Sequence, residues 1–154
     1  MSIDLERFVH AQDAGGTFAR ALAELNAGAK RSHWIWFVFP QLAGLGSSPM
    51  AGMYGLQGVD EATAYLRHPV LRDRLLSAMN AVREADARLK PRAPLRRLMG
   101  SQIDALKLVS SMTLFSEIAK RLRDDEVATA ADDILKRAEA DGLSACAFTQ
   151  RTLA

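Results

Sequence analysis

Residues 30–46, KRSHWIWFVFPQLAGLG, are the stretch on which the fold of this chain depends most. They include both tryptophans, Trp34 and Trp36, and two of the six phenylalanines. Aromatic side chains bury the most area per residue, so a run of this kind is typical of a hydrophobic core. Polar side chains flank the rings on both sides, which indicates a place where the core opens into a pocket. A functional site is therefore expected close to this stretch.

The periodicity of the stretch leaves its secondary structure open. Residues 33–39 are rich in β-formers and fit a buried strand. A helix capped by Ser32 fits equally well, provided that it ends or kinks at Pro40. The rest of the chain offers no clear second strand to pair with it, which favours the helix.

Amphipathic helical patterns surround this stretch on both sides. Helices are expected over residues 4–12, 18–27 (capped by Thr17), 60–68 (capped by Asp60), 70–89, 95–99, 102–122 (capped by Ser101) and 127–140. Ile103, Leu106, Leu114 and Ile118 are expected on the buried face of the helix at 102–122. Residues 50–56 and 146–154 show only weak patterns. The sequence thus predicts an all-α fold in which residues 1–154 form a single compact domain, an orthogonal or irregular bundle of about seven helices.

Size and composition fit one soluble domain: 154 residues, of which 49% are hydrophobic and 25% charged. The only cysteine, Cys146, excludes an intramolecular disulfide and a cysteine-based metal site, and a reducing compartment fits this usage. The N-terminus lacks the apolar core of a signal peptide, and no run approaches the ~18 apolar residues of a membrane span. A cytoplasmic location without membrane partners is therefore expected.

Charge is distributed unevenly although the net charge is only +2. Residues 67–97 contain nine Arg or Lys against three acidic residues, a net of +6. Residues 123–142 contain three basic and seven acidic residues, a net of −4. Such asymmetry can mark a surface for an anionic partner, but a solvated surface on which the charges compensate one another is the commoner explanation.

Five blocks of the sequence form a recognisable set. They are FVHAQ (residues 8–12), KRSHWIWFVFPQ (30–41), GLGSS (44–48), EATAYLRHPVL (61–71) and DALKLVSSMTLF (104–115). Together they resemble the bacterial and fungal family known as domain of unknown function 1810, whose members are sometimes labelled calpastatin-like. The resemblance covers nearly the whole chain and implies a small all-α fold, hence a helix in the aromatic stretch. It implies no known reaction, and the calpastatin label has little weight because calpastatin inhibitory segments are disordered and polar.

Three residues are candidates for catalysis: His33, Lys107 and Ser111. His33 is the best general acid or base by its ordinary pKa, although a structural hydrogen bond to the backbone is the favoured interpretation. Lys107 and Ser111 share a helical stripe with Asp104, and a desolvated lysine can activate a serine hydroxyl. The favoured alternative is a polar stripe in which Lys107 pairs with Asp104 and the serines bond to the backbone.

Ligand binding is expected at the blocks 30–41 and 104–115 and at the loop 44–48. The loop at residues 44–48 offers backbone N–H groups to an anion, but it lacks the Gly-Lys-Ser/Thr ending of a P-loop. His10, His33 and His68 do not have the spacing of metal ligands, so neither a metal nor a cofactor is expected. The candidate ligand-binding residues are Lys30, Trp34, Trp36, Gln41, Ser47 and Ser110.

Two functions fit these observations. In the first, the chain binds a polar or anionic small ligand in an aromatic and polar pocket, and the sequence leaves open whether it is an enzyme. In the second, it is a non-enzymatic interaction module whose basic surface at residues 67–97 meets nucleic acid or an acidic protein, although no nucleic-acid motif is present. The first requires the blocks that contain His33 and Lys107 to meet in space. The oligomeric state is not indicated.

Overall fold

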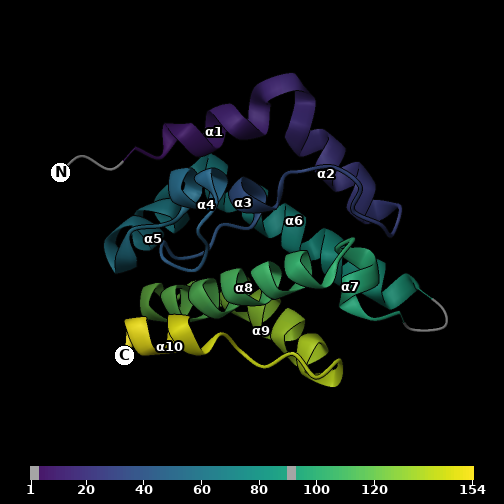
Figure 1. Ribbon diagram of the computed structural model, residues 1–154. Helices are drawn as coiled ribbons and strands as arrows, with labels where there is room; N and C mark the ends of the chain where they lie inside the picture. The colour runs from purple at the N-terminus through teal and green to yellow at the C-terminus, as the bar shows by residue number, and fades with distance from the viewer. Residues whose placement is uncertain (1–3, 90–92) are drawn as a thin grey trace.

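Helices account for nearly all the regular structure in the computed structural model, which describes residues 4–89 and 93–154 (Figure 1). Within these residues no strand occurs, and a single parallel bridge joins Leu42 to Leu56. In chain order the elements are α1 (Glu6–Asp13), the 3₁₀ turn η1 (Ala14–Gly16), α2 (Thr17–Asn26), α3 (Ile35–Val38), α4 (Pro49–Tyr54), α5 (Gly58–Arg67), α6 (Pro69–Arg88), α7 (Leu95–Leu98), α8 (Gln102–Leu122), α9 (Asp125–Ala140) and α10 (Ala147–Leu153). The predicted all-α fold is confirmed, with more helices than the seven expected.

The helices pack around one hydrophobic core. In Figure 1, α1 and α2 cover one side, α8, α9 and α10 form the other, and α3 to α6 lie between them. The largest side chains with no solvent exposure come from different parts of the chain: Phe8, Trp34, Tyr65 and Phe115. The rings of Phe8 and Phe115 both contact Tyr65, with centroids 5.1 and 5.4 Å away. The core therefore joins α1, α5 and α8.

The long helices begin and end where the sequence predicts. The Ser101 side chain caps α8 by accepting a hydrogen bond from the backbone N–H of Asp104 (3.1 Å). Pro69 occupies the first turn of α6, where its missing N–H has no cost. The C-terminus of α9 is followed by Gly142 with φ +81.

The aromatic stretch is helical for only one turn. The helix α3 covers Ile35–Val38, and Trp34, which precedes it, has non-helical backbone angles. The cap predicted at Ser32 is wrong, because the Ser32 hydroxyl donates to the Glu24 carboxylate instead (2.5 Å). That contact holds the chain before α3 in an irregular conformation, and Pro40 prevents the helix from continuing.

Four smaller expectations are corrected by the structure. The helices α4 and α10 form in segments that were weakly patterned. Asp60 lies in the first turn of α5 and is not its cap, and the Thr17 hydroxyl donates to the Ala14 carbonyl and does not cap α2. Ile103 and Leu106 are 66% and 46% exposed, because a neighbouring stripe of apolar residues with the same helical spacing faces the core instead. That stripe consists of Ala105, Leu108, Met112, Phe115 and Ala119.

Gly100, between α7 and α8, faces the backbone of Lys30. Its φ is +85, and a Cβ at this position would lie 2.8 Å from the Lys30 carbonyl oxygen. We expect Gly100→Ala to lower the free energy of unfolding by about 2 to 3 kcal/mol, measured by urea denaturation. Gly15→Ala is the control, since Gly15 also has a positive φ (+61) but no atom within 4 Å of its Cβ position. Equal losses in the two variants would show that the close approach to Lys30 is unimportant.

Candidate functional site

The two polar blocks of the sequence meet between α3 and α8. The Lys107 ammonium nitrogen, on the second turn of α8, lies 5.0 Å from the ring centroid of Trp36 on α3. This is a cation–π contact, in which the negative face of the indole attracts the cation. The blocks at residues 30–41 and 104–115 thus meet in space at Lys107 and Trp36.

A small pocket opens beside this contact. It lies between α3, α4 and α8 and contains a cavity of about 10 Å³, which is about the space of one water molecule. Four lining residues carry polar groups in their side chains: Trp36, Gln41, Tyr54 and Lys107. Apolar and aromatic groups form most of the remaining lining, including Phe39 and the ring of Tyr54. The pocket therefore combines a hydrophobic wall with a few side chains that can donate hydrogen bonds.

Trp36 contributes a donor without an acceptor. Its indole Nε1 is buried and has no hydrogen-bond partner within the described part of the chain, and the same is true there only of Ser111 Oγ. An indole N–H can only donate, and leaving a buried donor unpaired costs about 1 to 3 kcal/mol. A ligand with a hydrogen-bond acceptor would satisfy this N–H and, if negatively charged, would also be attracted by the nearby Lys107 cation.

Lys107 contributes a positive charge that no carboxylate of residues 4–89 and 93–154 neutralises. Asp104, the partner considered from the sequence, binds Lys30 instead, with 2.8 Å between Lys30 Nζ and Asp104 Oδ2. The ion pair that the sequence favoured between Lys107 and Asp104 is therefore wrong. Because Lys107 is half-buried, its charge is available to the pocket and is only partly screened by solvent.

Lys30 and Trp34 lie behind the pocket and do not line it. The Lys30 side chain is 5% exposed, donates to the Ser32 carbonyl (2.5 Å) and lies 4.9 Å from the Trp34 ring centroid. Trp34 is fully buried, and its Nε1 donates to Glu24 (2.9 Å). Both side chains thus have their polar groups satisfied and hold the aromatic stretch in place.

Glu24 is the residue at the centre of this support. Its carboxylate accepts from the backbone N–H groups of Arg31 and Ser32, from the Ser32 hydroxyl and from the Trp34 indole. Burial opposes the charged form, but these hydrogen bonds outweigh it and lower the pKa of Glu24 to about 2. Nothing in the sequence pattern singled out Glu24, because its partners lie seven to ten residues further along the chain.

The remaining candidate residues lie elsewhere. His33 and Ser47 are exposed and do not line the pocket. The Ser110 hydroxyl bonds to Cys146 at the start of α10. Burial raises the pKa of the Cys146 thiol, but the hydrogen bonds from Ser110 and Thr149 lower it overall. Ser111 follows Lys107 by one helical turn, and its buried hydroxyl forms no hydrogen bond with Lys107.

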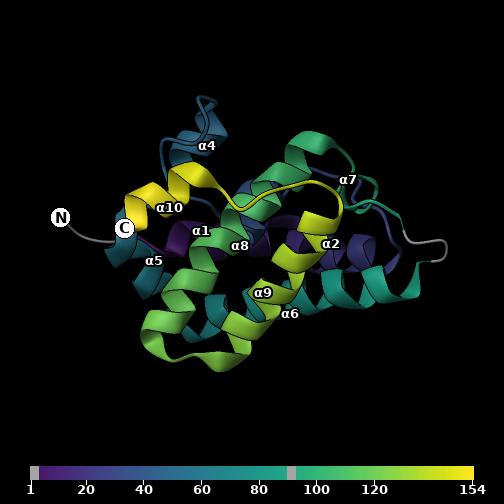
Figure 2. The same ribbon diagram turned by 90° about the horizontal axis from the view of Figure 1, so that it is seen from below.

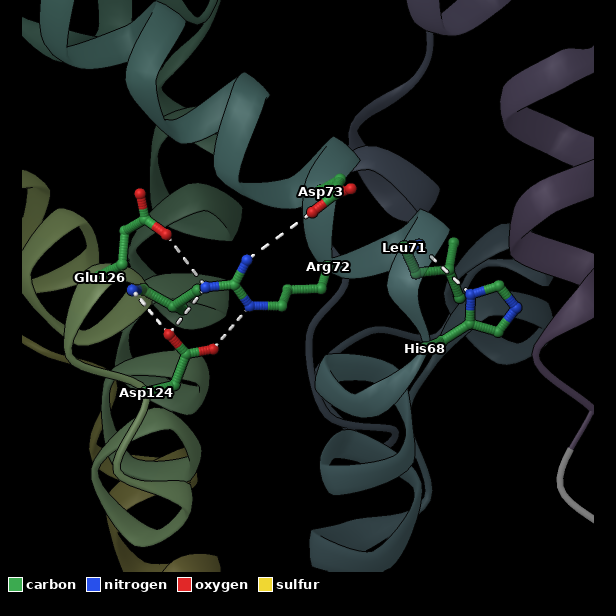
Figure 3. Close-up of polar contacts among 7 residues, drawn as sticks. His68, Leu71, Arg72, Asp73, Asp124 and Glu126 are labelled. Carbon is green, nitrogen blue, oxygen red and sulfur yellow. Dashed lines mark hydrogen bonds and ion pairs between the residues drawn. The ribbon is translucent and has the colours of Figure 1, made fainter.

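Three arginines of the basic region, all on α6, lie in ion pairs with acidic residues packed against the helix. Figure 3 shows Arg72 pointing away from α6 towards Asp124 and Glu126, with nitrogen–oxygen distances of 2.8 and 3.2 Å. The Arg72 guanidinium holds the pKa of Asp124 below its ordinary value. Arg74 binds Asp13 and Arg83 binds Asp133 in the same way (2.8 and 2.6 Å). Lys90 and Arg92 lie outside the described residues. Part of the charge asymmetry of the sequence therefore corresponds to ion pairs across the fold.

In residues 4–89 and 93–154 no group of three or more His, Cys, Asp or Glu side chains is placed to hold a metal ion. No helix there is both long enough and apolar enough to cross a membrane.

Similar proteins define the fold without indicating a reaction. A family model described as "Protein of unknown function (DUF1810)" matches residues 2–139. The crystal structure of the conserved hypothetical protein Rv1873 from Mycobacterium tuberculosis is similar over 98% of this chain and 96% of that chain, with 38% sequence identity and a TM-score of 0.77. No curated protein matches the chain.

Proposed function

The chain belongs to the family described as protein of unknown function (DUF1810), and we propose that it binds a small monoanion of the carboxylate type in the pocket between Trp36, Gln41 and Lys107. The family match and the similar crystal structure confirm the family resemblance that the sequence showed. One observation carries the proposal. The buried Trp36 Nε1 has no acceptor, and the Lys107 ammonium, which no carboxylate of the described residues neutralises, packs against the same Trp36 side chain.

The donors of the pocket favour an acceptor ligand. The Trp36 N–H and the Lys107 ammonium can only donate, and the Gln41 amide can donate as well as accept. A carboxylate accepts on two oxygens and therefore suits two neighbouring donors. Charge-assisted hydrogen bonds of this kind contribute about 1.5 to 3 kcal/mol each.

The charge of the pocket favours one negative charge over two. Lys107 is the only cationic side chain that lines it within the described residues, and Gln41 is neutral. A phosphate dianion would keep an uncompensated charge in a partly dry site, which is costly. The aromatic and apolar lining, with Phe39 and Tyr54, suits the carbon-bearing part of an organic acid.

The proposal concerns binding, and no reaction is assigned to the site. His33 is exposed and outside the pocket, and Ser111 forms no hydrogen bond to Lys107. The catalytic roles of His33, Lys107 and Ser111 stay predictions. The basic surface at residues 67–97 is not proposed as a binding site, because Arg72, Arg74 and Arg83 lie in ion pairs.

Replacing Lys107 with methionine tests the proposal. Acetate, benzoate and phenylacetate serve as probes, with acetamide and benzamide as neutral analogues of similar shape, and binding is measured by calorimetry and tryptophan fluorescence. We expect at least one carboxylate to bind the wild type better than its amide. We also expect Lys107→Met to weaken that binding about tenfold or more, because a charge-assisted bond is lost while the apolar stem is kept.

Lys136→Met is the matched control, since Lys136 is exposed on α9 and does not line this pocket. It should bind the probes as the wild type does. Trp36→Phe, which keeps a ring but removes the N–H, should weaken binding in the same direction as Lys107→Met. The proposal is wrong if no carboxylate binds better than its amide, or if Lys107→Met retains wild-type affinity.

A further inference from the structure

The two ends of residues 43–55 are joined to each other at one point. The Ala43 N–H donates to the Leu56 carbonyl (2.8 Å), and the Leu56 N–H donates to the Gln41 carbonyl (2.9 Å). These bonds form the parallel bridge between Leu42 and Leu56, which are both buried. A surface segment whose two ends are held together in this way is an Ω-loop, and it can move as a unit about its base.

The base itself is closely packed. A Cβ on Gly55 would lie 2.7 Å from Ala43 Cα, so only glycine allows the two ends of the segment to approach this closely. Motion is therefore expected in the segment beyond this contact and not in the bridge.

The helix α4, in the middle of the segment, forms one wall of the pocket. Met50, Ala51 and Tyr54 line the cavity, yet none of the six residues of α4 is buried. Figure 2 shows α4 at the edge of the molecule. The segment contacts the core through partly buried side chains, among them Tyr54, whose ring lies 5.7 and 5.3 Å from the rings of Phe8 and Phe37. Such a segment is expected to open at a lower free-energy cost than the fully buried helices. The wall from α3 is different, because Ile35 is 1% exposed and belongs to the core.

One side chain from α1 ties the C-terminal end of α4 to the body. Arg7 Nε donates to the Met53 carbonyl (2.8 Å) and Arg7 Nη2 to the Gly55 carbonyl (3.3 Å). The same guanidinium binds the Glu61 carboxylate on α5 (2.7 Å). Arg7 thus connects the end of the segment to two helices that do not belong to it.

The closed pocket is too small for the ligand class proposed above. Its cavity of about 10 Å³ has room for one water, whereas acetate, the smallest carboxylate probe above, has four non-hydrogen atoms. Because the α3 wall is fixed in the core, α4 is the part that must move. We propose that residues 43–55 are a lid over the Trp36–Lys107 pocket, anchored at the Leu42–Leu56 bridge and held closed by Arg7. This inference rests on the proposed function of the pocket.

The accessibility of Trp36 measures the position of the lid. Trp34 has no solvent exposure, so collisional quenching of tryptophan fluorescence reports mainly on Trp36. Acrylamide is a neutral quencher and iodide is a monoanion, so the two probes separate access from charge. For Arg7→Met we expect a rise of about twofold or more in quenching by both, and amide hydrogen exchange about tenfold faster in residues 49–55 but unchanged in α8.

Two further variants complete the test. Ser48→Ala removes the side-chain cap of α4, whose oxygen accepts from the Ala51 N–H (3.1 Å), and should shift quenching and exchange in the same direction without disturbing α1 or α5. Arg20→Met is the control, since Arg20 also donates to a loop carbonyl, that of Gly15, but far along the chain from the lid. It should leave both measurements unchanged.

The outcomes distinguish the lid from the anion site. If Arg7→Met and Ser48→Ala leave the quenching of Trp36 and the exchange of residues 49–55 at wild-type values, the lid is refuted. If Lys107→Met does not reduce quenching by iodide relative to acrylamide, the anion site is refuted, whatever the lid variants show. A lid without an anion site and an anion site without a lid therefore give different results.

Discussion

Replacing Glu24 with alanine is expected to lower the free energy of unfolding by about 3 kcal/mol at pH 7, measured by urea denaturation. The variant removes a charged acceptor and leaves the Trp34 indole N–H, which belongs to a fully buried residue, without its partner. It also frees the segment that precedes α3, so the fluorescence of Trp36 should change as well. Loss of stability without any change in Trp36 fluorescence would show that Glu24 does not position the pocket.

Glu24→Gln separates the charge of this group from its shape. The folded-state pKa of about 2 lies below the ordinary value of 4.5, so the charged form stabilises the fold. That contribution is complete above about pH 4.5 and is lost as the pH falls towards 2. The stability advantage of the wild type over Glu24→Gln should therefore shrink across this interval. Glu84→Gln, at an exposed position on α6, should change the stability at pH 7 much less than Glu24→Gln does.

Replacing Arg137 with methionine is expected to cost about 3 to 5 kcal/mol, an effect of the size seen when one partner of a buried ion pair is removed. The Arg137 side chain is 6% exposed and binds Asp86 and Asp141, each at 2.6 Å. It also donates to the Ala93 carbonyl and so connects α6, α9 and the segment before α7. The variant keeps much of the apolar volume but removes the buried guanidinium that links the two carboxylates and the Ala93 carbonyl.

Arg83→Met is the matched control for Arg137. Its guanidinium also binds a carboxylate at 2.6 Å, that of Asp133, but both side chains are more than one-third exposed. Exposed pairs contribute about 0 to 1 kcal/mol, so this variant should unfold at nearly the wild-type urea concentration. Similar losses in the two variants would contradict the view that burial makes Arg137 important.

The long helices could be predicted from the sequence because their signals are local. The cap Ser101, Pro69 in the first turn of α6 and Gly142 after α9 each act on residues within one turn of themselves. The short helices α4 and α10 were missed since they contain too few residues for a period to be recognised, although Ser48 and Pro49 are a cap and first-turn pair. The form of the aromatic stretch could not be predicted because Glu24, on another helix, determines it.

The pocket could be predicted in part. Trp36, Gln41 and Lys107 were singled out as polar or amphipathic residues within apolar blocks, and the structure brings these three together. Lys30 and Trp34 show the same sequence pattern, but the Lys30 ammonium pairs with Asp104 and the Trp34 indole N–H donates to Glu24. No local pattern identifies these two partners. The contribution of α4 was missed because residues 50–56 were expected to be irregular.

The turn between α8 and α9 has a consequence for how the chain folds. Arg123, with φ 58, ends α8, and the next residue, Asp124, already caps α9 by accepting from the Val127 N–H (3.3 Å). Two long helices with an extensive mutual interface are thus joined by a very short connection, so little loop entropy is lost when they pair. We expect this hairpin to form in the transition state for folding, with residues 43–55 becoming ordered only after the barrier has been crossed.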